Sequence, residues 1–111
     1  MKYRTRSSGK VWIIDVTGDI KIALGDLALR SAVQDLFLEG HCHILVNLEK
    51  VPYMDTMGLG ELVMSRKRAL DKGGDVRLLN PSKAVRQILE ATMLHHVFEV
   101  FDDESKAVAS F

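Results

Sequence analysis

The sequence predicts an α/β fold in which a mixed, mostly parallel sheet of four to five strands carries helices and begins with a β-hairpin. Three observations lead to this fold class. Short segments rich in β-branched and aromatic residues alternate with longer segments whose apolar residues recur every three or four positions. Two strand-like segments stand together at the start of the chain, separated by a short turn. Strands that alternate with helices are joined by right-handed crossovers, and such crossovers build a parallel sheet.

The size and composition of the chain are those of an ordinary soluble globular protein. Its 111 residues are enough for one core and too few for two, so we expect residues 1–111 to form a single domain. Fifteen basic side chains balance fifteen acidic ones, so the excess of Lys and Arg that drives binding to nucleic acid is missing. The single cysteine, Cys42, fits a reducing compartment. Because no apolar run approaches the ~20 residues that span a bilayer, we expect a cytoplasmic protein without membrane insertion.

The chain is expected to start with a hairpin. Residues 3–7 and 11–16 have the composition of strands, and Gly9 between them suits a tight turn. A break follows after residue 16, and residues 20–24 show no regular period. They are interpreted as a connection that docks apolar side chains without forming a regular element.

A helix and a buried strand come next. Residues 25–39 have a helical apolar period, and Gly40 is a suitable stop. The apolar face of this helix consists of Leu29, Ala32, Val33, Leu36 and Phe37. Residues 43–48 are almost continuously apolar, which is typical of a strand covered on both faces.

The second half of the chain repeats the alternation. A second helix, ended by Gly73, presents an apolar face marked by Leu59, Leu62, Val63, Ala69 and Leu70, with Arg66 as its one polar break. A short strand at residues 76–79 follows, and then a helix entered at Pro81 or capped by Ser82. This third helix is expected to face the core with Ala84, Val85, Ile88 and Leu89. Residues 97–101 are predicted to be the last strand, and acidic residues 102–104 to begin a final helix.

The candidate site lies between the buried strand and the second helix. Asp55 and Thr56 stand at the start of that helix, where either side chain could serve only as an N-cap. Gly58 and Gly60 in the first turns each cost roughly 0.5–1 kcal/mol relative to Ala, which is easier to understand where another backbone approaches closely. Methionines on both sides of Thr56 are either core residues or an adaptable binding surface.

The segment at residues 46–60, VNLEKVPYMDTMGLG, resembles the signature of STAS domains, in particular of bacterial anti-sigma factor antagonists. Residues 16–19 (VTGD), 72–76 (KGGDV) and 80–85 (NPSKAV) support the resemblance, which covers nearly the whole chain. It implies a STAS fold and a partner-switching regulator that is not an enzyme and needs no cofactor.

The resemblance also implies which residues carry the function. Thr56 matches the hydroxyl residue that is phosphorylated by an anti-sigma factor, itself a serine/threonine kinase of the histidine-kinase-like ATPase type. The unphosphorylated antagonist binds this kinase and releases the sigma factor, and a phosphatase resets the cycle. Phosphate adds about −1.5 to −2 charges, which a helix N-terminus tolerates. Binding of the partner is assigned to Asp19, Lys21, Met54, Asp55, Met57, Gly58, Leu59 and Gly60.

Three positions differ from the family pattern. Thr56 replaces the more usual Ser, and Met57 stands where many members have a second Ser or Thr. Lys21 stands where many antagonists carry an Asp that helps to engage the kinase. The reversed charge at Lys21 suggests a different partner. The alternative function is therefore a STAS subunit of a membrane lipid-transport ABC complex, which binds the transporter ATPase without phosphorylation.

Other reactive side chains do not form a recognisable site. His41, Cys42 and His43 are metal-ligand types, but alternate side chains of a strand point apart; His95 and His96 are not expected to share a face either. No metal site is therefore predicted. The sequence lacks a nucleophile elbow and a phosphate-binding loop. The basic residues at 66–68 are interpreted as the solvated face of the second helix, with a rim for an acidic partner as the alternative.

Overall fold

The fold alternates strands and helices as the sequence predicts. A computed structural model describes residues 1–21 and 25–111. Residues 22–24, which belong to the predicted connection at 20–24, lie outside the described residues. In chain order the elements are β1 (Lys2–Ser8), β2 (Val11–Thr17), α1 (Asp26–Leu38), β3 (His43–Lys50), α2 (Thr56–Asp71), β4 (Asp75–Leu79), α3 (Lys83–Ala91), the 3₁₀ turn η1 (Leu94–His96), β5 (Val100–Phe101) and α4 (Glu104–Ala109).

The strands form one mixed sheet in the order β1-β2-β3-β4-β5. β1 and β2 are antiparallel, so the predicted N-terminal hairpin is confirmed, and Gly9 in its turn has the positive φ of +61° that glycine tolerates. β2, β3, β4 and β5 pair in parallel, as the helical crossovers between them require. β1 is therefore an edge strand, and β3 lies in the middle of the sheet.

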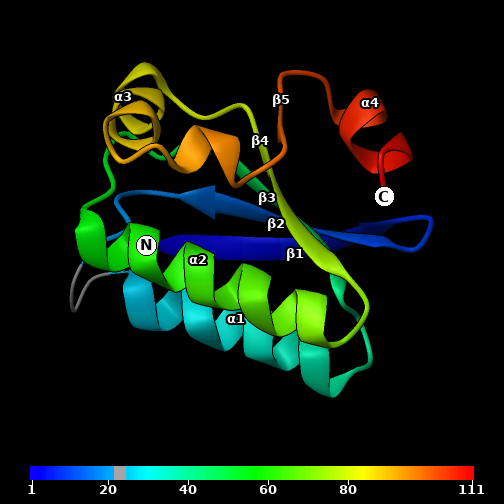
Figure 1. Cartoon of the computed structure of the whole chain (residues 1–111). Helices are drawn as coiled ribbons and strands as arrows, with labels where there is room; N and C mark the ends of the chain where they lie inside the picture. The colour runs from blue at the N-terminus through cyan, green and yellow to red at the C-terminus, as the bar shows by residue number, and fades with distance from the viewer. Residues whose placement is uncertain (22–24) are drawn as a thin grey trace.

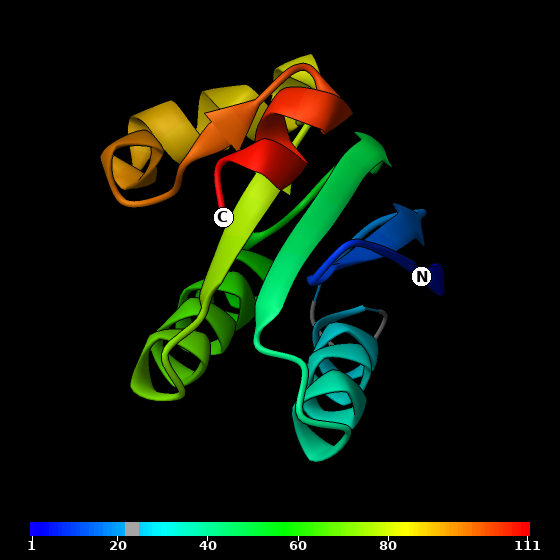
Figure 2. The ribbon, with the colours of Figure 1, turned by 90° about the vertical axis from the view of Figure 1, so that its right-hand side faces the viewer.

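Helices cover the two faces of the sheet unequally. α1 and α2 lie side by side along one face, and α4 lies on the other (Figures 1 and 2). The first face carries the larger core, in which strand residues such as Ile14, Val46 and Val76 meet α1 and α2, and which Val85 and Leu89 of α3 join. The second face carries a smaller core around Ala107 of α4, formed with Val11, Ile13, Leu45 and Leu79.

The helix ends follow ordinary capping chemistry. The Ser82 hydroxyl accepts a hydrogen bond from the Val85 amide and caps α3, which confirms one of the two predicted entries. Asp103 caps α4 in the same way through the Lys106 amide. Among the described residues, no helix is long and apolar enough to cross a membrane.

Two predictions about the core and one about the last strand need correction. Ala84 is exposed, because the nine-residue α3 buries only a narrow stripe around Val85 and Leu89. Leu70 is 45% exposed, since it lies in the last turn of α2, where Ala69 is the residue turned to the core. The last strand comprises only Val100–Phe101, because the Phe98 amide donates to the Leu94 carbonyl and commits the preceding residues to a turn.

Candidate functional site

Asp55 is the residue that caps α2. Its backbone is extended, and its Oδ1 accepts a hydrogen bond of 2.9 Å from the Gly58 amide. Thr56 is therefore the first residue of the helix rather than its cap, and its side chain is exposed. Within the described part of the chain, the Thr56 hydroxyl has no hydrogen-bond partner. The sequence left open whether Asp55 or Thr56 caps the helix. In the structure the Asp55 carboxylate is the cap, and the neighbouring Thr56 hydroxyl is accessible.

A second segment lies directly beside this helix start. Ile20 forms a parallel bridge with Met54, the Ile20 amide donates to the Tyr53 carbonyl at 3.0 Å, and the Asp55 amide donates to the Ile20 carbonyl at 3.2 Å. These bonds bring Asp19 and Lys21, which flank Ile20, to the same region of the surface as Thr56. The Lys21 ammonium lies 3.8 Å from the Asp19 carboxylate, and both side chains are more than one-third exposed.

Gly58 is required for packing inside the protein. A Cβ at this position would lie 2.2 Å from the Ile20 carbonyl oxygen, which no side chain can satisfy without movement of the backbone. Gly60 is different, since a Cβ there would meet nothing within 4 Å among the described residues. The close backbone approach expected from the two glycines therefore occurs at Gly58 alone. It involves the chain's own segment, so the interpretation of Gly58 as a place for a partner to approach was wrong.

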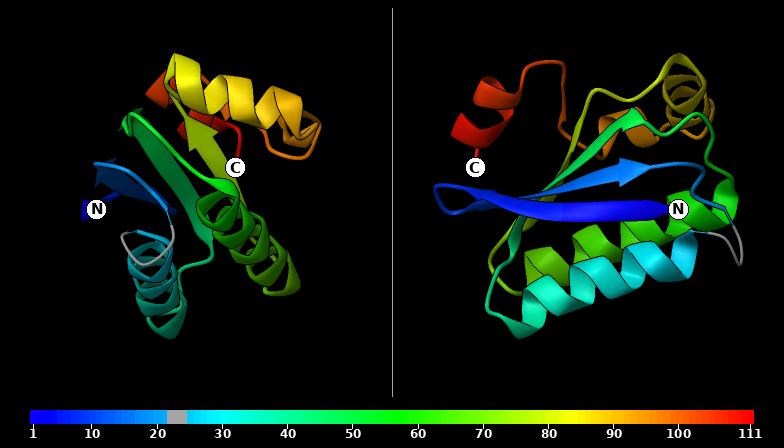
Figure 3. Two further views of the ribbon diagram at one scale, coloured as in Figure 1. Left: turned by 90° about the vertical axis from the view of Figure 1, so that its left-hand side faces the viewer. Right: turned by 180° about the vertical axis from the view of Figure 1, so that it is seen from behind.

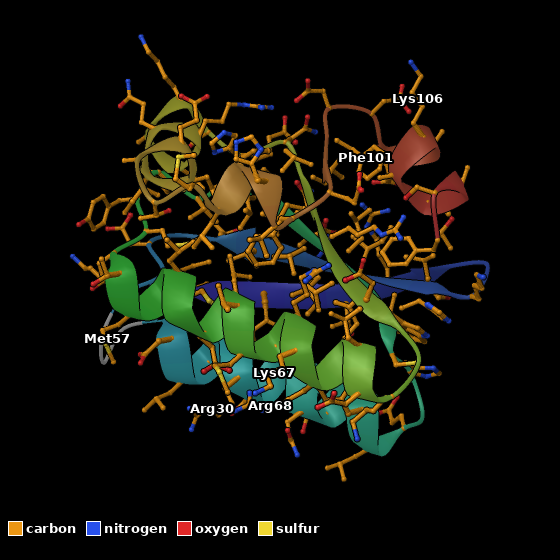
Figure 4. The ribbon with its side chains drawn as sticks, viewed as in Figure 1. Arg30, Met57, Lys67, Arg68, Phe101 and Lys106 are labelled. Atoms are coloured by element: carbon orange, nitrogen blue, oxygen red, sulfur yellow. The ribbon has the colours of Figure 1, made fainter. Side chains whose placement is uncertain are left out.

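The apolar residues around Thr56 divide into core and surface. Met54 and Leu59 are 1% and 3% exposed and belong to the larger core, so neither lies at the surface, where the sequence-based assignment to partner binding would require them. Met57 is 51% exposed at the N-terminal end of α2 (Figure 4). Tyr53 is 47% exposed, a surface residue that sequence reasoning did not include. Its position just before the buried Met54 in an extended segment is the signal that could have found it.

These observations define a candidate surface at the start of α2. We call it the α2 entrance surface; its members are Asp19, Lys21, Tyr53, Thr56, Met57 and Gly60. It combines two charged side chains, an accessible hydroxyl and two exposed apolar side chains. Such a surface can bind a protein, and its hydroxyl can accept a phosphoryl group.

A buried carboxylate fixes α2 against α1. Glu61 is 6% exposed and lies 3.3 Å from the guanidinium groups of both Arg30 and Arg68. The Ser65 hydroxyl donates to the same carboxylate at 3.4 Å. Figure 4 shows Arg30 and Arg68 converging from the two helices, while Lys67 projects from α2. Arg68 is therefore partly exposed and paired with Glu61, so the interpretation of this residue as part of a solvated face holds only in part.

A second carboxylate joins α2 to the sheet. Asp75, at the start of β4, lies 3.1 Å from the guanidinium groups of both Arg66 and Arg77. Arg77 also donates to the backbone carbonyl of Ser110, so this group reaches the C-terminal end of the chain. Arg66 thus belongs to an internal ion pair, which corrects the solvent-facing interpretation. A charged residue on the inner face of a helix is explained by a partner that the linear sequence does not reveal.

The histidines do not gather into a metal site. His41 stacks on Trp12 with ring centroids 4.6 Å apart, and His43 meets Phe111 edge to face. His95 and His96 lie with ring centroids 3.9 Å apart, so the expectation that they would not share a face was wrong; the 3₁₀ geometry of η1 brings them together. Over residues 1–21 and 25–111, no group of three or more potential ligands converges.

Comparisons with known proteins agree with this architecture. The family model described as STAS domain matches residues 2–107. The chain is 24% identical to the anti-sigma F factor antagonist of Paenibacillus polymyxa over 99 residues, which are 88% of this chain and 84% of the relative.

Solved structures share the fold at low sequence identity. An anti-sigma factor antagonist of Mycobacterium paratuberculosis matches with a TM-score of 0.86 at 17% identity, over 98% of this chain and 92% of the other. The antagonist SpoIIAA in its unphosphorylated form matches with a TM-score of 0.77 at 22% identity, over 96% of this chain and 93% of the other. SpoIIAA from Bacillus in its phosphorylated form matches with a TM-score of 0.75 at 19% identity, over 98% of each chain. A sulfate transporter family protein of Wolinella succinogenes matches at 0.76 and 20% identity, over 91% and 84% of the chains.

Proposed function

The chain belongs to the STAS domain family, and from this membership we propose that it is an anti-sigma factor antagonist controlled by phosphorylation of Thr56. In this proposal the unphosphorylated protein binds an anti-sigma factor kinase through the α2 entrance surface. The protein itself acts as a binding module and not as an enzyme. Support comes from the relative named as an antagonist and from the exposed Thr56 hydroxyl beside the capping Asp55.

The exposure of Thr56 is the observation that carries the proposal. A kinase must bring the γ-phosphate of ATP to the acceptor oxygen, so a hydroxyl that is exposed, and that makes no hydrogen bond to the described residues, is a suitable acceptor. Phosphate at the first residue of a helix lies near amides and the positive end of the helix dipole. The fold therefore accepts the added charge, and phosphorylation acts on the interface rather than on the core.

The charge of the phosphate provides the release step. Phosphothreonine adds about −1.5 to −2 charges next to the Asp55 carboxylate. The exposed apolar side chains of Tyr53 and Met57 lie at the same end of the helix. A partner that covers these side chains would have to bury the phosphate with them, which is costly without a matching cation. Phosphorylation is thus expected to dissociate the kinase, and removal of the phosphate by a phosphatase to restore binding.

The test is phosphorylation by the kinase with which the protein forms a complex. We expect ATP-dependent labelling of the wild type, loss of the label in Thr56→Ala, and full labelling of the matched control Thr5→Ala, whose hydroxyl is exposed on β1. Thr56→Ala should still bind the kinase, whereas Thr56→Glu should not. Labelling of Thr56→Ala as strong as that of the wild type would overturn the proposal.

A second candidate is a STAS subunit of a membrane lipid-transport ABC complex that binds the transporter ATPase without phosphorylation. Two observations favour it: Lys21 brings a positive charge to the α2 entrance surface, and the fold also occurs in a sulfate transporter family protein. The pair Thr56→Ala and Thr56→Glu separates the two functions. If the protein is a transporter subunit, a negative charge at position 56 does not control binding. Thr56→Ala and Thr56→Glu then bind the transporter ATPase to the same extent.

A further inference from the structure

We propose that the hollow on the uncovered part of the second sheet face binds a small organic phosphate. This site is separate from the α2 entrance surface and does not depend on the function proposed for Thr56. The hollow has a volume of about 480 Å³. Its lining comes from β1, β2 and β3 and comprises Lys2, Tyr3, Arg4, Arg6, Asp15, Val16, Thr17, Asn47, Glu49 and Lys50.

The hollow exists because α4 is too short to cover the second face. Its six residues pack over Ile13, Leu45 and Leu79. Seen from behind, α4 lies over the hairpin-turn end of β1 and β2, and the N-terminal end of β1 extends well beyond it (Figure 3, right). On this uncovered part the strand residues become polar, with Asp15 on β2 and Asn47 on β3 in register with each other. A polar sheet surface beside an apolar one indicates that water or a polar ligand, and not a helix, covers it.

The polar floor of the hollow is internally satisfied. Arg6 pairs with Asp15 at 2.7 Å and also binds Glu104 of α4. The Asn47 amide donates to Asp15 at 2.9 Å, and its carbonyl accepts from the Glu49 amide. The hydrogen bond from Arg6, followed by that from Asn47, holds the pKa of Asp15 below its usual range, so this carboxylate stays ionised. The floor therefore binds nothing further through Arg6, and a ligand must be recognised by the side chains around it.

Three of the surrounding side chains are cations to which the described part of the chain offers no partner. Lys2 and Arg4 alternate with Tyr3 along β1, so they share the face that Arg6 also occupies. Lys50 ends β3, in register with Thr17. Within the described residues, none of the side chains of Lys2, Arg4 and Lys50 makes a hydrogen bond or an ion pair. The lining carries four cations, which are Lys2, Arg4, Arg6 and Lys50, against the two carboxylates Asp15 and Glu49, while Arg6 also pairs with Glu104 outside the lining.

Protection of the sheet edge explains only part of this arrangement. Lys and Arg on an edge strand discourage pairing with another chain, and that would account for Lys2 and Arg4 on β1. It does not account for Lys50, which lies on the central strand β3 yet lines the same hollow. Cations that converge from an edge strand and from a central strand are what an anion site requires.

The shape and charge of the hollow favour a small phosphate ester or diphosphate. Its volume lies within the roughly 300–1,000 Å³ of small-molecule sites. The planar guanidinium of Arg4 can bind two phosphate oxygens at once, while Lys2 and Lys50, which both lie in register with Thr17, supply point charges. A ligand with two negative charges matches the excess of cations over carboxylates in this lining.

Pyrophosphate is a suitable probe for the test. It is titrated into ¹⁵N-labelled protein at about 0.15 M salt, where nonspecific attraction is screened. We expect saturating shifts of the amides at residues 2–5 and 47–50. The double variant Arg4→Gln, Lys50→Gln should bind at least tenfold more weakly, and the matched control Lys67→Gln, Lys83→Gln, which removes two exposed charges elsewhere, within twofold of the wild type.

Each other result would overturn the proposal. Equal weakening in the control would mean general attraction to exposed cations anywhere on the surface, and shifts that do not saturate would mean the absence of a site. Binding to vesicles that contain phosphatidylglycerol without any binding of pyrophosphate would assign the cations to a lipid surface instead. A thermal unfolding curve for each variant shows that it is folded, and phosphorylation at Thr56 is measured separately, so failure of one proposal leaves the other intact.

Discussion

The Ile20 carbonyl oxygen occupies the place where a Cβ on residue 58 would lie, with only 2.2 Å between them. This contact fixes the segment that carries Asp19 and Lys21 against the first turn of α2. We therefore expect Gly58→Ala to destabilise the protein by about 1–3 kcal/mol, the usual cost of overpacking, although Ala is the better helix former. Denaturant unfolding measures the change in the free energy of unfolding.

Gly60 supplies the matched control for this prediction. It lies in the same helix, but an added Cβ would meet no atom of residues 1–21 or 25–111 within 4 Å. Gly60→Ala should stabilise the protein by up to about 1 kcal/mol, since only the backbone entropy and the helix propensity change. Equal effects of Gly58→Ala and Gly60→Ala would contradict the role of the Ile20 contact.

The cap of α2 and the charge beside Thr56 reside in the same residue, Asp55, and can be separated. Asp55→Ala removes the hydrogen bond to the Gly58 amide and should cost about 1 kcal/mol of stability. Asp55→Asn keeps an oxygen acceptor and should cost less, but it removes the negative charge next to the phosphorylation site. If Asp55 contributes to release of the kinase, phosphorylated Asp55→Asn should retain more binding than the phosphorylated wild type, as measured by calorimetry.

Glu61 is expected to contribute to the attachment of α2 to α1. Glu61→Ala leaves Arg30 and Arg68 without their carboxylate, but both guanidinium groups are partly exposed and water can solvate them. The expected loss is therefore about 1–2 kcal/mol, below the value for a fully buried pair. Glu90→Ala, at an exposed position of α3, should change the free energy of unfolding by less than about 0.5 kcal/mol. A similar loss in both variants would argue against a special role of Glu61.

The ion pairs of Arg6 predict a dependence of stability on acid. The hydrogen bond from Arg6 is the largest cause that lowers the pKa of both Asp15 and Glu104. Carboxylates with a lowered pKa in the folded state stabilise the protein above their unfolded values, roughly 4, and lose this contribution as the pH falls through the folded values. Arg6→Gln should thus lower the melting temperature at pH 7 more than at pH 3. A difference that does not shrink in acid would contradict this coupling.

Much of the fold was readable from the sequence because it depends on local patterns. The hairpin around Gly9, the apolar face of α1 and the cap at Ser82 each follow from residues close together in the chain. The position of Thr56 at the start of α2 also follows from a local pattern, the family signature.

The features that could not be read depend on contacts between distant segments. Gly58 is explained by Ile20, and the burial of Glu61 by Arg30 on another helix. Neither partner is marked by spacing or composition. The sequence also predicted too many surface residues around Thr56. Met54 and Leu59 are buried because they pack against strands that are distant in the sequence.

Lys21 offers the sharpest test of partner choice. Its ammonium lies 3.8 Å from Asp19 on the α2 entrance surface, at a position where the resemblance to antagonists implies an Asp. Lys21→Asp replaces this ion pair with two neighbouring carboxylates. We expect it to strengthen binding to the anti-sigma F factor of Paenibacillus polymyxa, the organism of the related antagonist, at least tenfold.

Lys10→Asp, in the hairpin turn, changes the net charge equally and should leave this affinity unchanged. If both variants gain affinity alike, net charge and not the position of Lys21 governs the interaction. If Lys21→Asp gains nothing, the residue does not determine the partner. A gain specific to Lys21→Asp would mean that the natural partner carries an acidic side chain opposite Lys21, because like charges across an interface select against the wrong partner.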